Sequence, residues 1–424
     1  MTVTTKNETI KATLKATKER RQSQTCRTFE VKIDTSHLNT HSKDQLKRLF
    51  LEAKWLYNYI LSQNRVFDMD YKLSEVPVKV KDIFETRKLN HLSAQMKQSI
   101  IRRTMDNIRG LARLKEKGRK IGALKFKSYV NAIPLKQYDN TYKILNENYI
   151  RIQKVKQQLR VNGVSQLPIE SEIANATLIQ RHGDYYLAIT TYQAQTTPVV
   201  PAVKTVGIDV GIKTQVTLSD GISIQYSIPF SKKLRKSHQK LSKCQYRSQN
   251  WYKTKLKLDK AYTKVNNVKK DIKNKIVHYL QANYGVVCYQ DDNIKGWQRL
   301  WGRKILSTAI GGIISTLEDK VQTPIAVDRW FPSTKTCSQC GHIREIGLDE
   351  RIYVCAVCGN VMDRDFNASV NIEIEGVKQV GMVRTDVKPA EIESSTLASL
   401  EYLNTIPYVK ASSVYETGSL TALA

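Results

Sequence analysis

The segment Val206-Gly-Ile-Asp-Val-Gly-Ile-Lys-Thr-Gln-Val-Thr-Leu218 decides the fold of the second half of the chain. Its apolar and β-branched residues predict a hairpin of two buried strands. Asp209 lies inside the first strand, where a carboxylate is costly to bury unless it is paired or binds a metal. The flanking Gly207 and Gly211 let a backbone or ligand approach closely. A functional carboxylate is therefore one reading of Asp209, and an ordinary Asp near a turn is the other.

Two further buried strands are predicted at Gly285-Val-Val-Cys-Tyr289 and Pro324-Ile-Ala-Val-Asp328, separated by a helix from about residue 300 to 317. The order strand, helix, strand is typical of an α/β sheet. The first of these strands runs into Gln290-Asp-Asp-Asn293. Acids that end apolar strands commonly lie at the active edge of a sheet.

A third acidic position, Asp365, lies in Asp363-Arg-Asp-Phe-Asn-Ala368, where a helix is predicted to begin. An Asp at a helix start can be a cap, and it can also hold a divalent cation. Three acidic positions from separate elements would bind two Mg²⁺ ions, which together cleave a phosphodiester.

Seven cysteines occur, and four of them form two close pairs. Cys337-Ser-Gln-Cys340 and Cys355-Ala-Val-Cys358 are separated by fourteen residues, a spacing typical of a tetrahedral Zn²⁺ site. Four thiolates leave no open position for a substrate, so we expect a structural zinc that holds a ribbon with little apolar core. The other three cysteines, Cys26, Cys244 and Cys288, are scattered, and the odd total argues against a disulfide framework.

The formal net charge of +29 predicts a polyanionic partner, most simply nucleic acid. Solubility alone and membrane-surface binding are the alternatives. Residues 231–275 hold sixteen Lys and Arg against two Asp, too one-sided for internal ion pairing. We therefore predict that phosphates contact this region, with a solvated helix face as the alternative. The candidate contacts are Lys232, Lys233, Arg235, Lys236, Lys253, Lys255 and Lys257.

The first half of the chain changes its pattern twice. Residues 28–34 alternate as a strand, and residues 41–118 are mainly helical and basic. Short strands are then predicted at 123–128, 149–153 and 185–191, which would close a small barrel with the strand at 28–34. We expect residues 1–27 to be a flexible basic arm, Gln195–Val203 a linker, and 376–424 a disordered tail. No run of about 20 apolar residues would span a bilayer, and no signal peptide is evident, so we expect a cytoplasmic protein.

Four motifs in a fixed order resemble a known family. They are Gly207-Ile-Asp-Val-Gly211, Asp292-Asn-Ile-Lys-Gly296, Phe331-Pro-Ser-Thr-Lys-Thr-Cys337 with the cysteines that follow, and Asp363-Arg-Asp-Phe-Asn-Ala368. Across roughly residues 204–373, the sequence resembles the TnpB proteins of bacterial insertion sequences and the related miniature type V CRISPR effectors.

The resemblance implies an α+β multidomain fold. A wedge-like β-barrel (28–40 and 119–197) would carry an inserted helical recognition region (41–118). An RNase H-like α/β RuvC domain (204–330 and 360–375) would carry the zinc ribbon (331–359). It also implies an RNA-guided, Mg²⁺-dependent DNA endonuclease whose partners are a guide RNA and double-stranded target DNA. The resemblance further implies a bacterial protein associated with the nucleoid. Asp209 would match the first RuvC acid and Asp365 the third, and the four paired cysteines would match the zinc ligands.

One departure concerns the second acid, because Gln290 stands where the family usually has Glu. If the strand continues, Asp292 faces the same side as Gln290 and Asp291 the other side. We therefore predict Asp292 as the replacement ligand, with Asp291 as the alternative. A nuclease-inactive, repressor-like DNA binder and an unguided transposase or resolvase remain competing hypotheses. The source of the guide, the flanking DNA motif and the choice between monomer and homodimer stay open.

Overall fold

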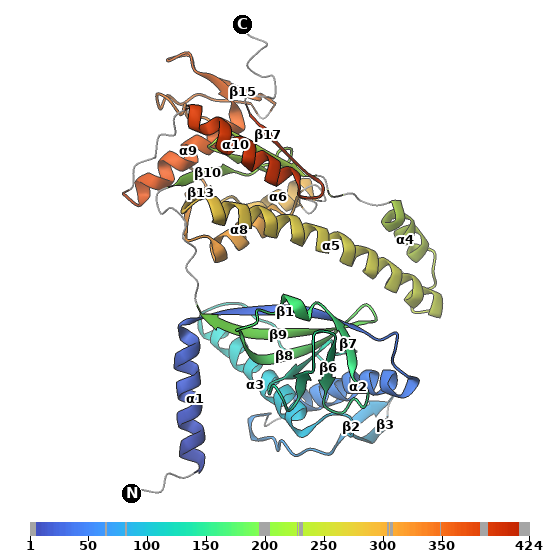
Figure 1. Ribbon diagram of the computed structural model, residues 1–424. Helices are drawn as coiled ribbons and strands as arrows, with labels where there is room; N and C mark the ends of the chain where they lie inside the picture. Colours follow the sequence, from blue (N-terminus) through green and yellow to red (C-terminus); the bar gives the residue numbers. More distant parts are fainter. Residues whose placement is uncertain are drawn as a thin grey trace, which may run out of the picture. The chain divides into compact units, whose positions relative to one another are not determined.

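The computed structural model describes residues 6–63, 66–80, 83–194, 204–226, 228, 232–302, 305, 308–347, 349–381 and 389–414. The chain forms two compact units, an N-terminal unit, Met1–Thr196, and a C-terminal unit, Thr197–Ala424 (Figure 1). Among the described residues, no helix is both long and apolar enough to cross a membrane. The predicted linker at 195–203 lies outside the described residues.

The N-terminal unit is built on a seven-stranded sheet in the order β4-β8-β9-β1-β7-β6-β5. Alternation explains the strands, because Val31 and Ile33 are buried between exposed neighbours and pair with Leu187 and Tyr185. The predicted barrel is thus a nearly closed sheet whose edge strands are β4 and β5. Its strands are β1 (Gln24–Asp34), β4 (Ala132–Leu135), β5 (Tyr142–Ile144), β6 (Tyr149–Ile152), β7 (Leu159–Asn162), β8 (Glu172–Arg181) and β9 (Asp184–Ala194).

Two amphipathic helices pack with this sheet in one core. They are α2 (Thr40–Ser62), capped by the Asn39 side chain, and α3 (Ala94–Glu116), capped by Ser93. A hairpin of β2 (Glu75–Val80) and β3 (Ile83–Lys88) lies between them, and short 3₁₀ turns occupy Val66–Asp68 and Val164–Gln166. The predicted helical region at 41–118 therefore also contains a two-stranded sheet.

Two expectations for the N-terminal unit are wrong. Residues 1–27 are not a loose arm in the described part, because α1 (Lys6–Gln22) precedes β1, which begins at Gln24. Arg20 and Arg21 at the end of α1 bind Glu172 of β8 at 2.8 and 2.7 Å, which holds the helix to the sheet. Residues 123–128 form no strand. There the backbone N–H and C=O of Lys127 are satisfied by the side chain of Asn58 instead of a partner strand.

The C-terminal unit is built on a six-stranded sheet in the order β14-β13-β10-β11-β12-β17. The predicted hairpin is confirmed, with Ile208 opposite Leu218, and the strands β10, β13 and β14 run parallel. The strands are β10 (Thr205–Asp209), β11 (Val216–Leu218), β12 (Ile222–Tyr226), β13 (Val286–Gln290), β14 (Thr323–Val327) and β17 (Val409–Ser413).

Helices cover both faces of this sheet. One face packs against α5 (Gln249–Asn283), α8 (Ile310–Lys320) and α10 (Pro389–Asn404), and the other packs against α9 (Arg364–Gln379). Val206 and Ile208 of β10 belong to the first core, while Gly207 between them lies against α9. Two more helices, α4 (Lys232–Ser242) and α6 (Ile294–Trp301), complete the unit.

Two expectations for the C-terminal unit are corrected. The helix predicted from about residue 300 to 317 is two helices, α6 and α8. Residues 376–424 are not a disordered tail in their described part. Leu400, Leu403 and Ile406 are buried in the core, and β17 completes the sheet by pairing with β12. Residues 382–388 and 415–424 lie outside the described residues.

Candidate nuclease centre and metal site

Asp209 is the last residue of β10, at the edge of the sheet where the parallel strand β13 also ends. The preceding Gly207 explains the tight packing beneath it. A Cβ on Gly207 would lie 2.0 Å from the carbonyl oxygen of Ser369 in α9. The predicted close backbone approach at this glycine is confirmed, and it brings the first turn of α9 to the edge that carries Asp209.

Asp365 lies in that first turn of α9. The helix is capped by a different acid: Asp363 Oδ1 accepts hydrogen bonds from the backbone N–H groups of Asp365 and Phe366, both at 2.9 Å. This separates two readings of the sequence, because Asp363 takes the capping role and leaves the carboxylate of Asp365 available for other contacts. The sequence carries a signal for this cap, because Asp363 is of the residue type that commonly caps a helix and stands just before it.

Two arginines contact the carboxylate of Asp365. Arg364 donates from Nε and Nη2 to Oδ1 at 3.1 and 2.9 Å, and Arg351 Nη1 lies 3.7 Å from Oδ2. The side chains of Arg364 and Asp365 are 13% and 17% exposed, so this ion pair is largely shielded from water. Sequence reasoning missed both arginines, since no local pattern marks a contact from Arg351, fourteen residues away.

The Asp291-Asp292 pair follows the end of β13 in a tight turn. Asp292 N donates to Gln290 O at 2.8 Å, and Ile294 N donates to Asp292 O at 2.8 Å, so the chain bends at once. Asp291 is exposed and pairs with Arg329, whereas Asp292 is half-buried. Burial and the negative charge of Asp291 raise the pKa of Asp292 to about 6. The alternation argument is wrong in its premise, because the strand does not continue past Gln290.

Gln290 holds the chain that leaves β14. Its amide Nε2 donates to the carbonyl oxygens of Asp328, Arg329 and Phe331 at 3.1, 3.3 and 2.8 Å. Its Oε1 accepts a hydrogen bond from Ser333 Oγ at 2.9 Å. A glutamate could not make the three donated bonds, so glutamine at this position has a structural role that its sequence did not reveal.

Electrostatics link the three predicted acids. Burial raises the pKa of Asp209 well above its usual range, and the negative charges of Asp365 and Asp292 raise it further, while Arg364 opposes them. The charges of Asp365, in a helix, and of Asp292, in a turn, therefore both act on Asp209 at the end of its strand. Within the described residues, these three acids are less tightly gathered than the cysteine group below.

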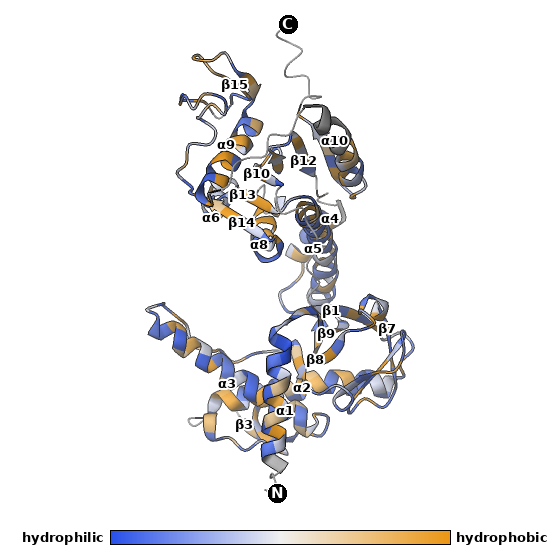
Figure 2. Ribbon diagram, turned by 60° about the vertical axis from the view of Figure 1, so that its left-hand side comes forward, coloured by the Kyte–Doolittle hydropathy of each residue, from blue (hydrophilic) through white to orange (hydrophobic). Residues whose placement is uncertain are grey.

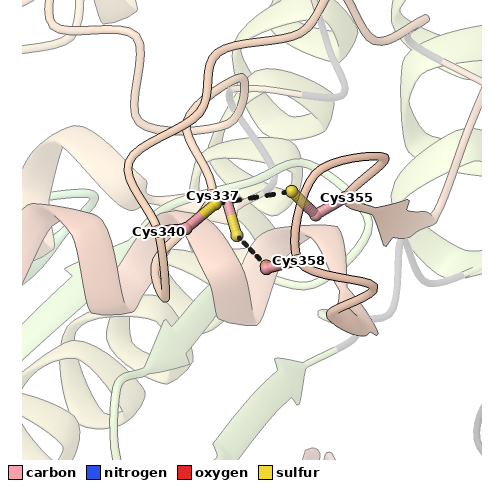
Figure 3. A group of neighbouring side chains, drawn as sticks. All are labelled: Cys337, Cys340, Cys355 and Cys358. Atoms are coloured by element: carbon pink, nitrogen blue, oxygen red, sulfur yellow. Dashed lines mark hydrogen bonds between the residues drawn. The ribbon is translucent and has the colours of Figure 1, made fainter.

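The four paired cysteines converge as predicted, with all four sulfur atoms within 4.8 Å of one another (Figure 3). Each pair forms the same turn. Cys337 N and Cys355 N donate to the carbonyls of His342 and Asn360, and Gly341 and Gly359 adopt positive φ. Hydrogen bonds from the backbone N–H of Cys358 and Val357 lower the pKa of Cys355 to about 6. The four thiols can thus hold one metal ion.

Two buried asparagines attach this ribbon to α9. Asn367 Nδ2 donates to Thr336 O at 2.7 Å and its Oδ1 accepts from Ser338 N at 3.0 Å. Asn371 Nδ2 donates to Ser333 O and Thr336 O at 2.8 and 2.6 Å. The ribbon also contains β15 (Ile352–Val354), which pairs with β16 (Val361–Asp363). The metal site and Asp365 are therefore joined through one helix.

The predicted phosphate contacts lie on α4 and α5. Arg235, Lys236, Lys253, Lys255 and Lys257 are exposed, and α5 is largely hydrophilic in Figure 2. Lys232 and Lys233 begin α4, but their side chains lie outside the described residues.

Two protein-family models match parts of this chain. A family model described as "Cas12f1-like, TNB domain" matches residues 314–372, which contain the four cysteines and Asp365. A second, described as "Probable transposase", matches residues 188–299, which contain Asp209 and Asp292. These two matches agree with the resemblance to the TnpB proteins and the miniature type V effectors, and each covers less than half of the chain.

Two curated relatives similar to this chain are named as RNA-guided DNA endonucleases. "Putative RNA-guided DNA endonuclease" of Streptomyces pristinaespiralis is 27% identical, over 54% of this chain and 59% of the relative. "Putative RNA-guided DNA endonuclease InsQ" of Escherichia coli (strain K12) is 24% identical, over 48% and 57%. The match thus spans less than two thirds of each relative. A solved Cas12f1–sgRNA–target DNA complex is 15% identical, with a TM-score of 0.47, over 79% of this chain and 83% of that one.

Proposed function

We propose that this chain is an RNA-guided DNA endonuclease whose C-terminal unit holds an RNase H-like RuvC domain. The observation that carries the proposal is the position of Asp209, a carboxylate at the sheet edge where β10 ends, whose pKa is raised by burial and by the charges of Asp365 and Asp292. On this proposal residues 204–330 and 360–375 form the nuclease domain and 331–359 the zinc ribbon. Residues 28–40 and 119–197 form the wedge, and 41–118 the recognition region.

The residues at this edge fit Mg²⁺. Carboxylate oxygens are its preferred protein ligands, and the mutual repulsion that raises the pKa of Asp209 would be relieved by a divalent cation. Asp209, Asp292 and Asp365 would hold the metal. A pair of such ions activates a water and stabilises the leaving oxygen of a phosphodiester.

Neighbouring residues of the chain position and partly neutralise the acids at this edge. Asp363 fixes the first turn of α9 and hence the direction of Asp365. Gln290 fixes the segment that leaves β14, and with it the neighbouring turn that carries Asp292. Arg364 and Arg351 form ion pairs with Asp365, which would reduce the repulsion between the carboxylates before a metal binds.

Guide RNA and target DNA are the partners that the charge favours. The exposed lysines and arginines of α4 and α5 offer a phosphate-binding face, and the formal charge of +29 favours a polyanionic partner. Sequence would then be read by base pairing with the guide, while the protein reads shape and a short flanking motif.

Zinc at the four cysteines has a structural role in this proposal. A Cys₄ site leaves no open coordination position. Through Asn367 and Asn371 it would hold the segment 333–338 against α9 and so support Asp365.

One observation favours a second candidate, an RNA-guided DNA-binding protein that does not cleave. Gln290 occupies the family's usual Glu position and is fully used in holding backbone carbonyls. Asp292 must then supply the second ligand from a turn. If it does not, the centre keeps only two acids.

The test starts from protein purified together with its RNA. A defined co-purifying RNA is expected for a guided protein, and its absence would leave the unguided transposase or resolvase. The complex is then incubated with matched DNA and Mg²⁺. Cleavage is expected from wild type and not from Asp209→Ala, Asp365→Ala or Asp292→Ala.

Asp291→Ala is the matched control, because Asp291 is adjacent, exposed and paired with Arg329. It should cleave like wild type. Cleavage that survives Asp292→Ala but not Asp291→Ala would exchange their roles. A wild-type complex that binds matched DNA and never nicks it would establish the second candidate.

A further inference from the structure

Three aromatic side chains form an exposed cluster where α4 connects to α5. Tyr246 and Trp251 pack edge to face with ring centroids 5.2 Å apart, and Trp251 and Tyr252 do so at 5.1 Å. Tyr246 is 68% exposed and Tyr252 is 54% exposed. Large aromatic surfaces left in water at a defined geometry mark a binding surface more often than a packing one.

The cluster is not what holds the two helices together. The helices contact each other through other residues: His238 of α4 hydrogen-bonds to Tyr262 of α5 and packs edge to face on its ring. Leu234 of α4 and Leu258 of α5 are buried. The turn itself is fixed by its backbone: Ser248 caps α5 by accepting from Trp251 N at 3.1 Å, and Ser248 N donates to Gln245 O. The rings therefore stand on a rigid turn, and their exposure calls for another explanation.

The segment that carries the cluster is strongly cationic. Ten Lys and Arg and no acidic residue lie between positions 232 and 258. Arg247 lies 5.1 Å from the centroid of the Tyr246 ring, and Lys255 lies 4.8 Å from that of Trp251. An apolar protein partner would have to bury these charges, whereas a polyanion with flat aromatic groups matches both features.

Unpaired nucleotides have that chemistry. Their bases stack on aromatic side chains with little sequence preference, and their phosphates pair with lysine and arginine. Bases inside a duplex are already stacked on one another, so only an unpaired segment offers free faces. We propose that Tyr246, Trp251 and Tyr252 form a stacking platform for unpaired bases, with the phosphates held by the surrounding lysines and arginines.

The two possible sources of such a segment, a single-stranded part of the guide RNA and the displaced strand of the target DNA, rest on the proposed function. Binding itself does not, since a stacking platform needs neither a matched target nor Mg²⁺. The inference can therefore be tested apart from cleavage.

The test uses the full chain freed of co-purified nucleic acid and dye-labelled 12-residue oligonucleotides, as RNA and as DNA. Each has an abasic partner with the same phosphates and no bases. Fluorescence anisotropy gives the dissociation constants at several salt concentrations. Tyr246→Ala/Tyr252→Ala should weaken binding of base-carrying oligomers by about 5- to 100-fold, and should leave the abasic ones within about twofold.

Two controls separate stacking from charge and from misfolding. Tyr246→Phe/Tyr252→Phe retains the rings and should bind like wild type. Lys253→Ala should weaken binding of base-carrying and abasic oligomers alike and reduce the salt dependence. Equal losses for both kinds of oligomer in the Tyr-to-Ala double variant would overturn the proposal, as would wild-type binding by that variant.

The nucleic acid whose binding falls further identifies the source: RNA indicates the guide, and DNA the displaced strand. A chain that stacks bases but never cleaves would refute the proposed nuclease and leave this inference standing. A cleaving chain whose double variant loses no base-dependent affinity would do the reverse.

Discussion

The guanidinium of Arg364 donates two hydrogen bonds to one carboxylate oxygen of its sequence neighbour Asp365, from Nε at 3.1 Å and from Nη2 at 2.9 Å. The same cation lowers the pKa of Asp209, which burial and the neighbouring charges raise. Arg364 thus occupies the role of a counterion at an edge where the charges of Asp365 and Asp292 act on Asp209. A divalent cation at that edge would compete with it.

Replacing Arg364 by Gln should therefore have opposite effects with and without metal. Loss of a largely buried ion-pair partner costs about 3 kcal/mol, so Arg364→Gln should melt several degrees below wild type in chelator. Added Mg²⁺ should raise its melting temperature more than it raises that of wild type, because the freed carboxylates bind the ion without competition. Thermal melts in EDTA and in MgCl₂ measure both effects.

Arg351→Gln is the matched comparison for Arg364→Gln. Arg351 is 46% exposed and lies 3.7 Å from the other oxygen of Asp365. Its loss should therefore change the free energy of unfolding by no more than about 1 kcal/mol, with or without Mg²⁺. If Mg²⁺ raises the melting temperature of Arg364→Gln no more than that of Arg351→Gln, competition between Arg364 and the metal is excluded.

A glutamate at position 290 should destabilise the protein. Gln290→Glu removes the two N–H donors that the carbonyl oxygens of Asp328, Arg329 and Phe331 share, and sets a carboxylate against those oxygens. The cost should be on the order of 2–3 kcal/mol, seen as a lower melting temperature, with no gain in cleavage rate. Ser333→Ala removes only the bond to Oε1 and should cost about 1 kcal/mol. A stable, faster-cleaving Gln290→Glu would show that position 290 is still a ligand position.

Metal content tests the cysteine site directly. Wild type should contain one zinc per chain by elemental analysis, and Cys355→Ser should lose it and become sensitive to protease between residues 337 and 359. Cys26→Ser, at an exposed cysteine in β1, should keep both the zinc and the protease resistance. Full zinc content in Cys355→Ser would exclude Cys355 as a ligand.

The carboxyl group of Asp220 in the C-terminal unit should make the stability of the protein depend on pH. Burial raises the pKa of Asp220, which accepts hydrogen bonds from Tyr284 Oη and from Ile222 N. A carboxyl with a raised folded-state pKa binds its proton more tightly in the folded state than in the unfolded one. The stabilisation it gives is complete below the ordinary value of 3.8 and is lost as pH rises through the folded-state pKa.

Asp220→Asn keeps Oδ1 as the acceptor for Ile222 N and can donate its NH2 to Tyr284 Oη, which is also an acceptor. It cannot ionise, so its free energy of unfolding at pH 7.5 should exceed that of wild type by on the order of 1 kcal/mol. The difference should shrink as pH falls toward 4. Melting curves of both proteins across that range measure it. A variant that is less stable than wild type at pH 7.5 would mean that the negative charge of Asp220 supports the fold.

Local patterns predicted the parts of this protein that depend on few residues. The cysteine turns, the β10–β11 hairpin and the start of α9 near Asp365 follow from spacing, alternation and capping within about a dozen residues. The prediction of Asp292 rests on a strand that continues past Gln290, and this premise is wrong because the chain turns there.

Long-range contacts explain what the sequence did not reveal. The C-terminal strand β17 has few charges and many small residues, and it is ordered only because β12, far earlier in the chain, offers an open edge. The three backbone carbonyls that hold Gln290 come from another strand's end, and the arginines on Asp365 include one from the ribbon. No periodicity in a single segment encodes such partners.

The packing under Asp209 gives the last prediction, which separates position from chemistry. Gly207→Ala would set a Cβ 2.0 Å from Ser369 O and 2.6 Å from Glu373 N, both backbone atoms of α9 that no side-chain rotation can move. The helix must shift, so Gly207→Ala should lower the melting temperature and reduce cleavage although every acid remains. Gly110→Ala in α3, where a Cβ meets nothing within 4 Å, should be neutral or slightly stabilising because alanine favours helix. Wild-type cleavage by Gly207→Ala would show that the distance between β10 and α9 does not control the centre.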